Sequence, residues 1–344
     1  MMKKTLIAAA ALMAGVAAQA QVNVYGTVDM SFGSFEEFNT TTGETDSIAK
    51  VESGVHTGSF IGFKGQEDLG GGLKAFFVLE SDIGADIGAS SDNGFWARTS
   101  ELGLAGDFGT VKLGNSRSLG FLANAAYNPF PVTGLMNTSQ ITNAYGNYAN
   151  AITYTSPNLS GFTVAAQAGM SEQDGVDNSI GLALNYAAGP LAVGFNYSTQ
   201  EGALAGFFAN ETALGATLAT LVTLPTANVD YDRWGLGASY DFGAAKLFGQ
   251  FGQNKYKGDG GSFKTKAFQL GTAIPVSAQG TVLASFAQTK LDDTDLKLRD
   301  LSVVYDHALS KRTSAYAGLK SLRISADGGS ETLNNVAVGI KHAF

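Results

Sequence analysis

The sequence predicts an all-β fold: a transmembrane antiparallel β-barrel of about sixteen strands, with a long third loop folded inward. Three observations support this prediction. Apolar and polar residues alternate over many runs of about ten residues, which indicates strands. Short turns alternate along the chain with longer connections. The composition combines 44 glycines, 22 phenylalanines and 12 tyrosines with no cysteine, which fits an exported all-β protein.

The first 20 residues have the features of a secretory signal. Lys3 and Lys4 form a short basic region, residues 6–18 are apolar, and Ala18-Gln19-Ala20 matches a cleavage site. The apolar run is too short to cross a bilayer as a helix. We therefore expect residues 1–20 to be a cleaved signal peptide and residues 21–344 to form one barrel domain.

The charge of the chain argues against nucleic acid as a partner. The formal net charge is −8, and loss of Lys3 and Lys4 with the signal lowers it to −10. Nucleic acids are polyanions, so a negative net charge does not favour their binding. The absence of cysteine excludes disulfides and thiolate sites. His56, His307 and His342 are scattered without metal-ligand spacing, so no cofactor is expected.

The predicted strands have apolar residues on one face and small or polar residues on the other. The alternation is clearest in residues 22–30, 179–186, 191–198 and 232–242, where the apolar face often ends in an aromatic residue. Aromatic residues at both ends of an apolar band are typical of membrane barrels. The strands are expected near residues 22–32, 59–68, 72–82, 95–107, 109–117, 150–157, 161–170, 178–187, 190–199, 230–242, 244–255, 264–276, 279–290, 297–308, 311–323 and 332–344.

The connections and the strand lengths favour a closed membrane barrel over a soluble β-sandwich. In hydrocarbon every backbone N–H and C=O needs a partner, and an open sheet edge has none. Sandwich strands average about five or six residues, which is shorter than most of these runs. Tight turns on one side and long loops on the other are typical of outer-membrane barrels. The longer connections are expected at residues 33–58, 83–94, 118–149, 171–177, 200–229, 256–263, 291–296 and 324–331.

Residues 118–149 are the loop that we expect to narrow the barrel. The segment is long, has no charged residue and is rich in apolar and aromatic side chains. Disorder requires polarity and net charge, so this loop should pack against something. Tyr127, Tyr145 and Tyr148 are candidates to line the constriction, and the alternative is that they pack the loop onto the wall. For Phe130 we favour packing.

Several blocks of the sequence resemble the general porins of Gram-negative outer membranes, of the type common in β-proteobacteria. The resemblance implies an outer-membrane location, a barrel of about sixteen strands, a homotrimer, and passive diffusion of small hydrophilic solutes. It also implies that the third loop forms the constriction and that the outer-membrane assembly machinery reads the terminal Phe344. The blocks are VNVYGTVD (22–29), GFKGQEDLGGGLKAFFVLES (62–81), ELGLAGDFGTVKLG (101–114), NAITYTSPNLSGFT (150–163) and VGIKHAF (338–344).

The resemblance also implies several arginines on the wall that faces the constricting loop. Arg98 stands where one is expected, and Lys64 keeps the charge of another. Phe60 and Tyr148 occupy positions where arginine is common in that family. We therefore expect a constriction that is more aromatic and less charged than in many of these channels.

Further charged residues are candidates for the pore lining. Lys74 and Arg117 could extend the basic side, and the alternative is that they lie near the rim. Glu80 and Asp82 end a predicted strand and could oppose the bases or be solvated. A charge in mid-strand costs roughly 2–4 kcal/mol on the lipid face, which excludes that face without establishing selectivity.

Asp292, Asp293 and Asp295 form an acidic loop. Divalent cations that bridge lipopolysaccharide, an expected partner together with other outer-membrane lipids, would suit it. The pattern lacks the glycine and terminal glutamate of a calcium loop. A solvated charge run is the favoured interpretation.

Three hypotheses for function follow. The first is a non-enzymatic diffusion channel. The second is a substrate-specific channel with a binding site at an aromatic constriction. The third, which is less favoured, is an outer-membrane lipase or protease barrel, which would need Ser, His and a carboxylate near one rim. Ion selectivity depends on which side chains meet at the narrowest point, and the sequence leaves it open.

Overall fold

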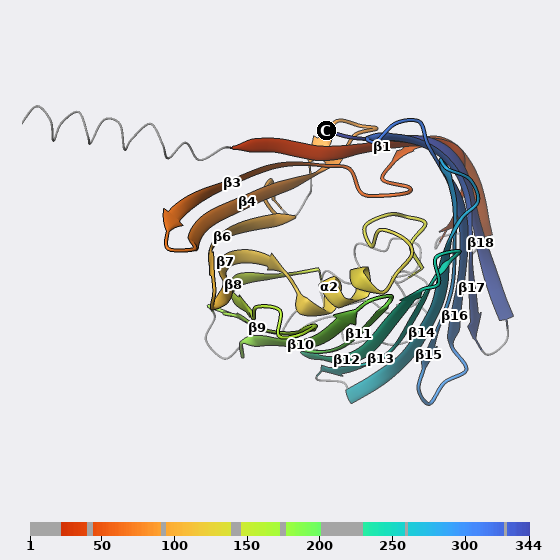
Figure 1. Cartoon of the computed structure of the whole chain (residues 1–344). Helices are drawn as coiled ribbons and strands as arrows, with labels where there is room; N and C mark the ends of the chain where they lie inside the picture. Colours follow the sequence, from red (N-terminus) through yellow and green to blue (C-terminus); the bar gives the residue numbers. More distant parts are fainter. Residues whose placement is uncertain are drawn as a thin grey trace, which may run out of the picture.

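The strands of the protein form one antiparallel barrel, seen end-on in Figure 1. The computed structural model describes residues 22–39, 44–90, 94–138, 146–172, 177–200, 230–258, 261–326 and 329–344. The predicted signal peptide and Tyr145 lie outside these ranges. None of the described helices has the length and apolar character that a membrane span requires.

Eighteen strands and one described helix make up the fold. Their bounds are β1 Asn23–Asn39, β2 Glu44–Ser53, β3 Phe60–Gly70, β4 Leu73–Gly84, β5 Ala89–Ser90, β6 Thr99–Gly106, β7 Gly109–Arg117, α2 Leu119–Ala126, β8 Asn147–Thr155, β9 Phe162–Gly169, β10 Ser179–Ala188, β11 Leu191–Gln200, β12 Asp230–Asp241, β13 Lys246–Gly258, β14 Gly261–Pro275, β15 Gly280–Leu291, β16 Lys297–Ala308, β17 Thr313–Ala326 and β18 Gly329–Ala343.

The eighteen strands occupy sixteen positions in the wall. Strands β2 and β3 share one position, since β2 pairs with the second half of β1 and β3 pairs with its first half. The two-residue β5 pairs only with β4 and lies in a connection. Strand β1 pairs on its other side with β18, which closes the ring. The predicted closed barrel of about sixteen strands is therefore confirmed.

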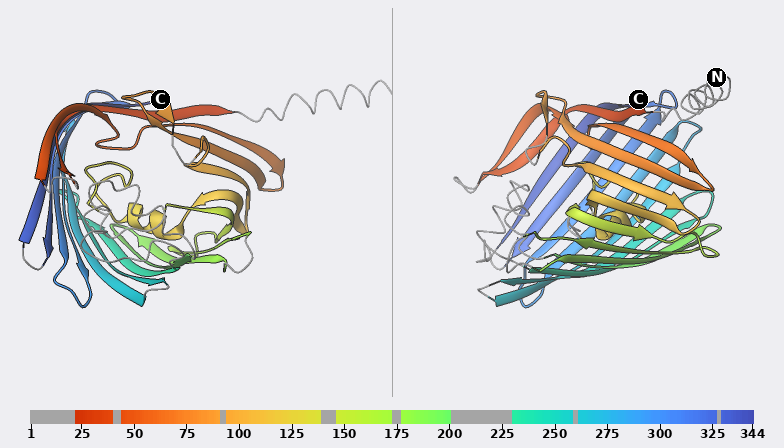
Figure 2. Two further views of the ribbon diagram at one scale, coloured as in Figure 1. Left: turned by 180° about the vertical axis from the view of Figure 1, so that it is seen from behind. Right: turned by 90° about the vertical axis from the view of Figure 1, so that its left-hand side faces the viewer.

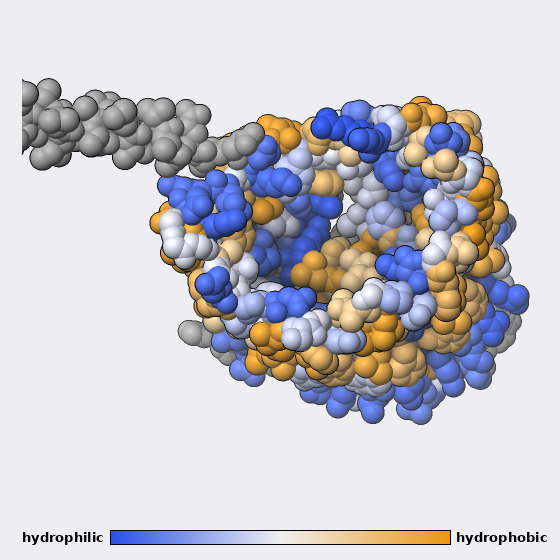
Figure 3. Space-filling model, in the orientation of Figure 1, coloured by the Kyte–Doolittle hydropathy of each residue, from blue (hydrophilic) through white to orange (hydrophobic). Residues whose placement is uncertain are grey.

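The two faces of the wall differ as the alternation predicted. Apolar side chains such as Phe32, Leu102 and Leu270 are 59–62% exposed on the outside, where a membrane barrel meets lipid. Polar side chains such as Asp29 and Ser302 are buried on the inside. Figure 3 shows apolar residues on much of the outer surface and mostly polar residues around the central hollow.

The two ends of the barrel also differ. The turns around residues 71–72, 107–108, 189–190, 276–279 and 309–312 connect strands at one end, and the longer connections lie at the other. Figure 2 shows the strands running obliquely between these ends. Near the short-turn end, Gly26 and Phe344 exchange two backbone hydrogen bonds of 3.2 and 3.1 Å.

Two differences from the sequence prediction affect the wall and the site. Residues 44–53, predicted to belong to a loop, form β2, which extends the wall with β1 and carries an ion pair of 2.9 Å between Lys50 and Glu37. These residues lack the apolar alternation of the other strands. The run predicted from residue 95 starts as a strand only at Thr99, which leaves Arg98 in a connection.

The loss of stability caused by an arginine on the lipid face depends on its depth in the bilayer. We expect Leu270→Arg, in the middle of β14, to lower the free energy of unfolding by about 2–4 kcal/mol, and Leu247→Arg, at the end of β13, by about 0–1 kcal/mol. Urea titration of protein folded in phosphatidylcholine vesicles measures both. Equal losses would contradict the placement of Leu270 in the bilayer core.

Candidate functional site: the constriction of the barrel

The loop after β7 turns into the barrel and begins with a helix. Ser118 caps α2, and its Oγ accepts a hydrogen bond of 3.1 Å from the backbone N–H of Phe121. Figure 1 shows α2 inside the ring of strands. A serine N-cap satisfies one of the free N–H groups of the first turn, so this short helix can begin directly at the end of a strand.

One face of α2 packs on the wall and the other faces the lumen. Leu119 forms a buried cluster with Ala165 of β9 and Ala183 of β10. Leu122 does not belong to this cluster and is 44% exposed. Since α2 lies within the barrel, this leucine gives the lumen an apolar side, and apolar surface is visible inside the hollow in Figure 3.

Tyr127 fixes the C-terminal end of α2 to the wall. Its side chain is 3% exposed and lies over Gly194 and Gly237, where a Cβ atom would collide with the ring. Its hydroxyl donates a hydrogen bond of 3.3 Å to Asn185, and Nε2 of Gln250 donates one of 2.9 Å to its carbonyl. The ring therefore lies between the loop and the wall, with little surface left for the lumen.

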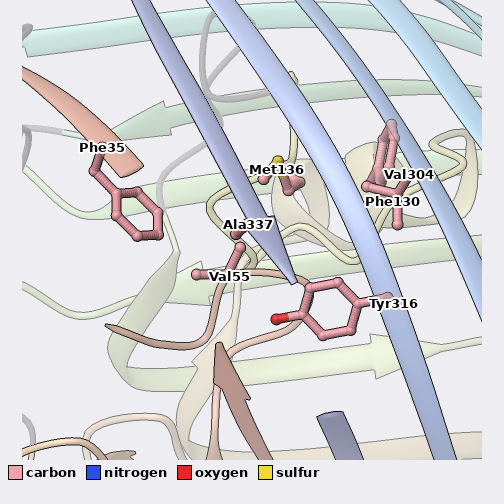
Figure 4. Packing of buried hydrophobic residues seen from close by; sticks show 7 residues of the cluster. All are labelled: Phe35, Val55, Phe130, Met136, Val304, Tyr316 and Ala337. Atoms are coloured by element: carbon pink, nitrogen blue, oxygen red, sulfur yellow. The ribbon is translucent and has the colours of Figure 1, made fainter. Parts of the chain in front are cut away.

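The tip of the loop packs on the opposite side of the barrel. Phe130 and Met136 are 2% and 0% exposed and form a cluster with Val304 of β16 and Tyr316 of β17. Figure 4 shows these side chains together with Phe35, Val55 and Ala337. The expectation that Phe130 packs the loop in place agrees with this arrangement.

A buried lysine holds the same tip. The ammonium of Lys320 on β17 donates to the carbonyls of Leu135 and Asn137 at 2.9 and 2.8 Å. It also forms an ion pair of 3.1 Å with Asp300 on β16, and both side chains are at most 5% exposed. The lysine thus joins two strands of the wall to the backbone of the loop.

An inward-folded segment between β2 and β3, residues 54–57, forms the surface on which the tip of the loop lies. The carbonyls of Gly54 and Val55 accept hydrogen bonds from the backbone N–H groups of Leu135 and Met136 at 3.1 and 2.9 Å. The loop therefore continues its backbone pairing onto residues 54–55.

The carboxylate of Asp29 holds this segment in turn. It accepts hydrogen bonds from the backbone of His56 and Thr57 at 2.7 and 2.6 Å and from the hydroxyl of Tyr316 at 2.7 Å. The ring of His56 contacts Asp306 at 2.9 Å. The sequence pattern predicted a loop at residues 54–57 and did not indicate this role. The only signal was a carboxylate on the inner face of the first strand.

The structure brings four of the predicted site residues together. Arg98 forms ion pairs with Glu80 at 3.1 Å and with Asp82 at 2.6 Å, and its guanidinium lies 4.2 Å from the centre of the Phe60 ring. The hydroxyl of Tyr25, which sequence analysis did not select, donates a hydrogen bond of 2.7 Å to Glu80. Two carboxylates thus offset the charge of Arg98.

Two other bases have aromatic neighbours instead of carboxylates. The ammonium of Lys64 lies 4.3 Å from the centre of the Tyr25 ring, and the guanidinium of Arg117 lies 4.6 Å from that of Phe121. Arg117 also donates to Asn147 at 3.0 Å. Within the described part of the chain, neither base forms an ion pair. Lys74 lies apart from them, opposite Asp68 beside the short turn between β3 and β4.

The remaining predicted residues lie elsewhere. Tyr148 is 3% exposed, and its hydroxyl donates to the carbonyls of Ile180 and Thr199. Asp292 pairs with Lys266 at 2.9 Å. In the described ranges no group of three His, Asp or Glu side chains is placed to hold a metal ion. An ion pair of 2.7 Å between Glu101 and Lys112 on the inner face was not predicted from the sequence.

We expect Lys320→Met to loosen the tip of the loop. The variant leaves Asp300 buried without its partner, which should cost about 3–5 kcal/mol of stability. Urea titration in vesicles measures this loss, and chymotrypsin cleavage within residues 118–149 measures the loosening.

The double variant Asp300→Asn/Lys320→Met is the control. It removes the buried charge and should recover much of the stability, while the loop stays open to chymotrypsin because its carbonyls still lack a donor. A loop that resists cleavage equally in all three proteins would contradict the anchoring role.

Comparisons with known proteins agree with this geometry. The model of the Gram-negative porin family matches residues 5–327. Outer membrane porin protein 32 of Delftia acidovorans is 35% identical and major outer membrane protein P.IB of Neisseria lactamica is 29% identical, each over 100% of both chains.

Solved structures share the fold. An anion-selective porin from Comamonas acidovorans superposes with a TM-score of 0.79 at 29% identity, over 95% of this chain and 100% of that one. The trimer form of OmpT of Vibrio cholerae superposes with a TM-score of 0.67 at 14% identity, over 94% and 99% of the two chains, and shows the fold alone. The family match points to a channel rather than an enzyme. The chain belongs to the Gram-negative porins, outer-membrane channels for passive diffusion.

Proposed function

We propose that the protein is a general diffusion channel for small hydrophilic solutes, with a slight preference for anions. Lys64 carries the proposal: it is exposed, it has no carboxylate partner in the described part of the chain, and it lies on the inner face of β3. The loop segment 118–138 contributes no charge. Arg98 contributes little net charge, because Glu80 and Asp82 offset it.

The proposal assigns the pore lining to both sides of the lumen. Lys64, Arg98 and Arg117 form the basic side together with Glu80, Asp82 and Phe60, and the exposed face of α2 forms the apolar side. Tyr127 and Tyr148 act as supports of the loop, because both are buried. Lys74 lies too close to the short-turn end to set selectivity.

The proposal includes assembly and export. A homotrimer is supported by the trimer form solved for OmpT. Residues 1–20 act as a signal peptide that is removed, and the assembly machinery of the outer membrane reads Phe344 at the end of the chain. We also propose that the protein is not an enzyme. His56 is committed to Asp306, while His307 and His342 contact Tyr305 and Thr313.

Conductance in a planar bilayer tests the channel itself. We expect insertion in three equal steps, conductance that grows with salt concentration, and no block by sugars. A saturable block by one solute would replace the general channel with a substrate-specific one. Turnover of an ester or peptide by purified protein would contradict the non-enzymatic part of the proposal.

Reversal potentials in a potassium chloride gradient test the selectivity. We expect wild-type protein to favour chloride slightly and Lys64→Glu to favour potassium, because the variant replaces an exposed base that has no carboxylate partner among the described residues with a carboxylate on the same side of the lumen. Lys74→Glu is the matched control on the same inner face and should leave the potential close to that of the wild type. Equal shifts in the two variants would show that total charge, and not the position of Lys64, sets selectivity.

A further inference from the structure

Arg233 is a buried base on the inner face of β12. Its side chain is 3% exposed, and the strand register places it between Ser198 of β11 and Asn254 of β13. It forms no ion pair with any of the described residues. A buried charge without a counter-charge is costly, so the position of Arg233 points to a partner of opposite charge.

The inner faces of the neighbouring strands offer no carboxylate near this base. In the described parts of β10–β14, the only other charged residues at inward positions are Asp241 and Lys246, which are opposite each other at the short-turn end. Asp241 follows Arg233 by eight residues, which corresponds to about 26 Å along a strand. The loop segment 118–138, whose helix α2 contacts β10–β12, is uncharged as well. The counter-charge is therefore not found in the described wall or loop.

The guanidinium also has unsatisfied donors. Its Nε and Nη1 atoms are buried and have no hydrogen-bond partner within the part of the chain that the structure describes. The hydroxyl of Tyr231, two residues away on the same face, donates to Asn254 at 3.1 Å. Because buried polar groups in native proteins are almost always paired, two orphaned donors on one cation indicate a ligand that accepts hydrogen bonds.

The amide of Asn196 lies beside the guanidinium. Its Nδ2 atom and Nη2 of Arg233 are 3.0 and 3.5 Å from the point where a Cβ atom of Gly235 would stand. Nδ2 donates to the carbonyl of Gly235 at 3.3 Å, and Oδ1 is buried without a partner among the described groups. A half-turn of the amide exchanges its oxygen and nitrogen, so Asn196 can present a further donor.

A small cavity adjoins these side chains. Arg233, Asn196 and Gln250 line it from the wall, and Ala123 and Tyr127 line it from the loop. About 10 Å³ of the cavity is open to the centre of a water-sized sphere, which is room for about one water molecule or one monatomic ion. The carbonyl of Tyr127 accepts a hydrogen bond of 2.9 Å from Nε2 of Gln250, so this oxygen at the end of α2 is already paired.

We propose that this cavity binds one monatomic anion of the size of chloride as the counter-ion of Arg233. The anion accepts charge-assisted hydrogen bonds from Nε and Nη1. Since Ala123 and Tyr127 belong to the loop, the bound ion also holds the end of α2 against the wall. The site goes beyond the proposed channel function, because Arg233 leaves almost no surface to solutes in the lumen.

Bromide locates the site directly in crystals of the full chain. Bromide has the charge of chloride, and its anomalous scattering distinguishes it from water. We expect an anomalous peak within hydrogen-bond distance of Nε and Nη1 of Arg233 in the wild type, and no peak there in Arg233→Met. Water beside the guanidinium, with bromide bound only to exposed bases, would overturn the proposal.

The dependence of stability on chloride tests the same site in a membrane. Urea titrations in phosphatidylcholine vesicles are compared at constant ionic strength while chloride replaces gluconate, which is too large for the cavity. One site present only in the folded protein raises the ratio of folded to unfolded protein by about tenfold for each tenfold increase in chloride above Kd. We expect this increase for the wild type and none for Arg233→Met.

Arg299→Met is the matched control, since it removes an exposed arginine from the outer face of β16. It should keep the chloride dependence of the wild type. Arg233→Met should fold, because it replaces a buried charge with an apolar side chain, and its urea midpoint in gluconate should be at least that of the wild type. Chloride dependence that is equal in all three proteins, or absent from all three, would contradict the assignment.

Discussion

The pairing of β1 with β18 is the constraint on which the rest of the structure depends. In hydrocarbon the backbone groups of two open edges would have no partners. The register that joins Thr27 to Ala343 closes the ring and fixes which face of every strand turns inward. A slip of one residue would either turn Val338 and Ile340 into the lumen or turn Asp29 toward lipid. The buried contact between Asp29, residues 54–57 and the tip of the loop therefore exists only in this register.

Inside the barrel, an uncharged loop must be held against a polar wall. Its side chains cannot form ion pairs, so the wall bonds to its backbone instead: Gln250 donates near the end of α2, and Lys320 donates at the tip. Glycines at 194 and 237 let Tyr127 approach the sheet closely. The loop is thus attached at two distant points of the ring, and the side between them is left apolar.

The sequence predicted the wall better than the attachments of the loop. Period-two alternation located the strands because lipid and water select opposite faces. The group of Arg98, Glu80 and Asp82 could be predicted from the sequence, since both carboxylates share one face of a strand. The burial of Tyr127 could not be predicted, because it depends on glycines of strands far along the chain. Strand β2 was not predicted, because it lacks the apolar alternation on which the prediction of strands depended. Its pairing with β1 is supported by charged residues such as Lys50 and Glu37.

The distribution of charge follows from what each face can offer as a partner. Inside, Asp300 and Glu101 lie beside fixed bases, because a buried charge without a counter-charge is costly. Outside, Lys290 stands between Lys266 and Lys297, and of these two only Lys266 has an ion pair within the described ranges, with Asp292 at 2.9 Å. The chain as a whole is acidic, so a shortage of carboxylates does not explain this row. Water and mobile ions screen exposed charges, so a row of lysines costs less on the outside than it would cost in the buried interior.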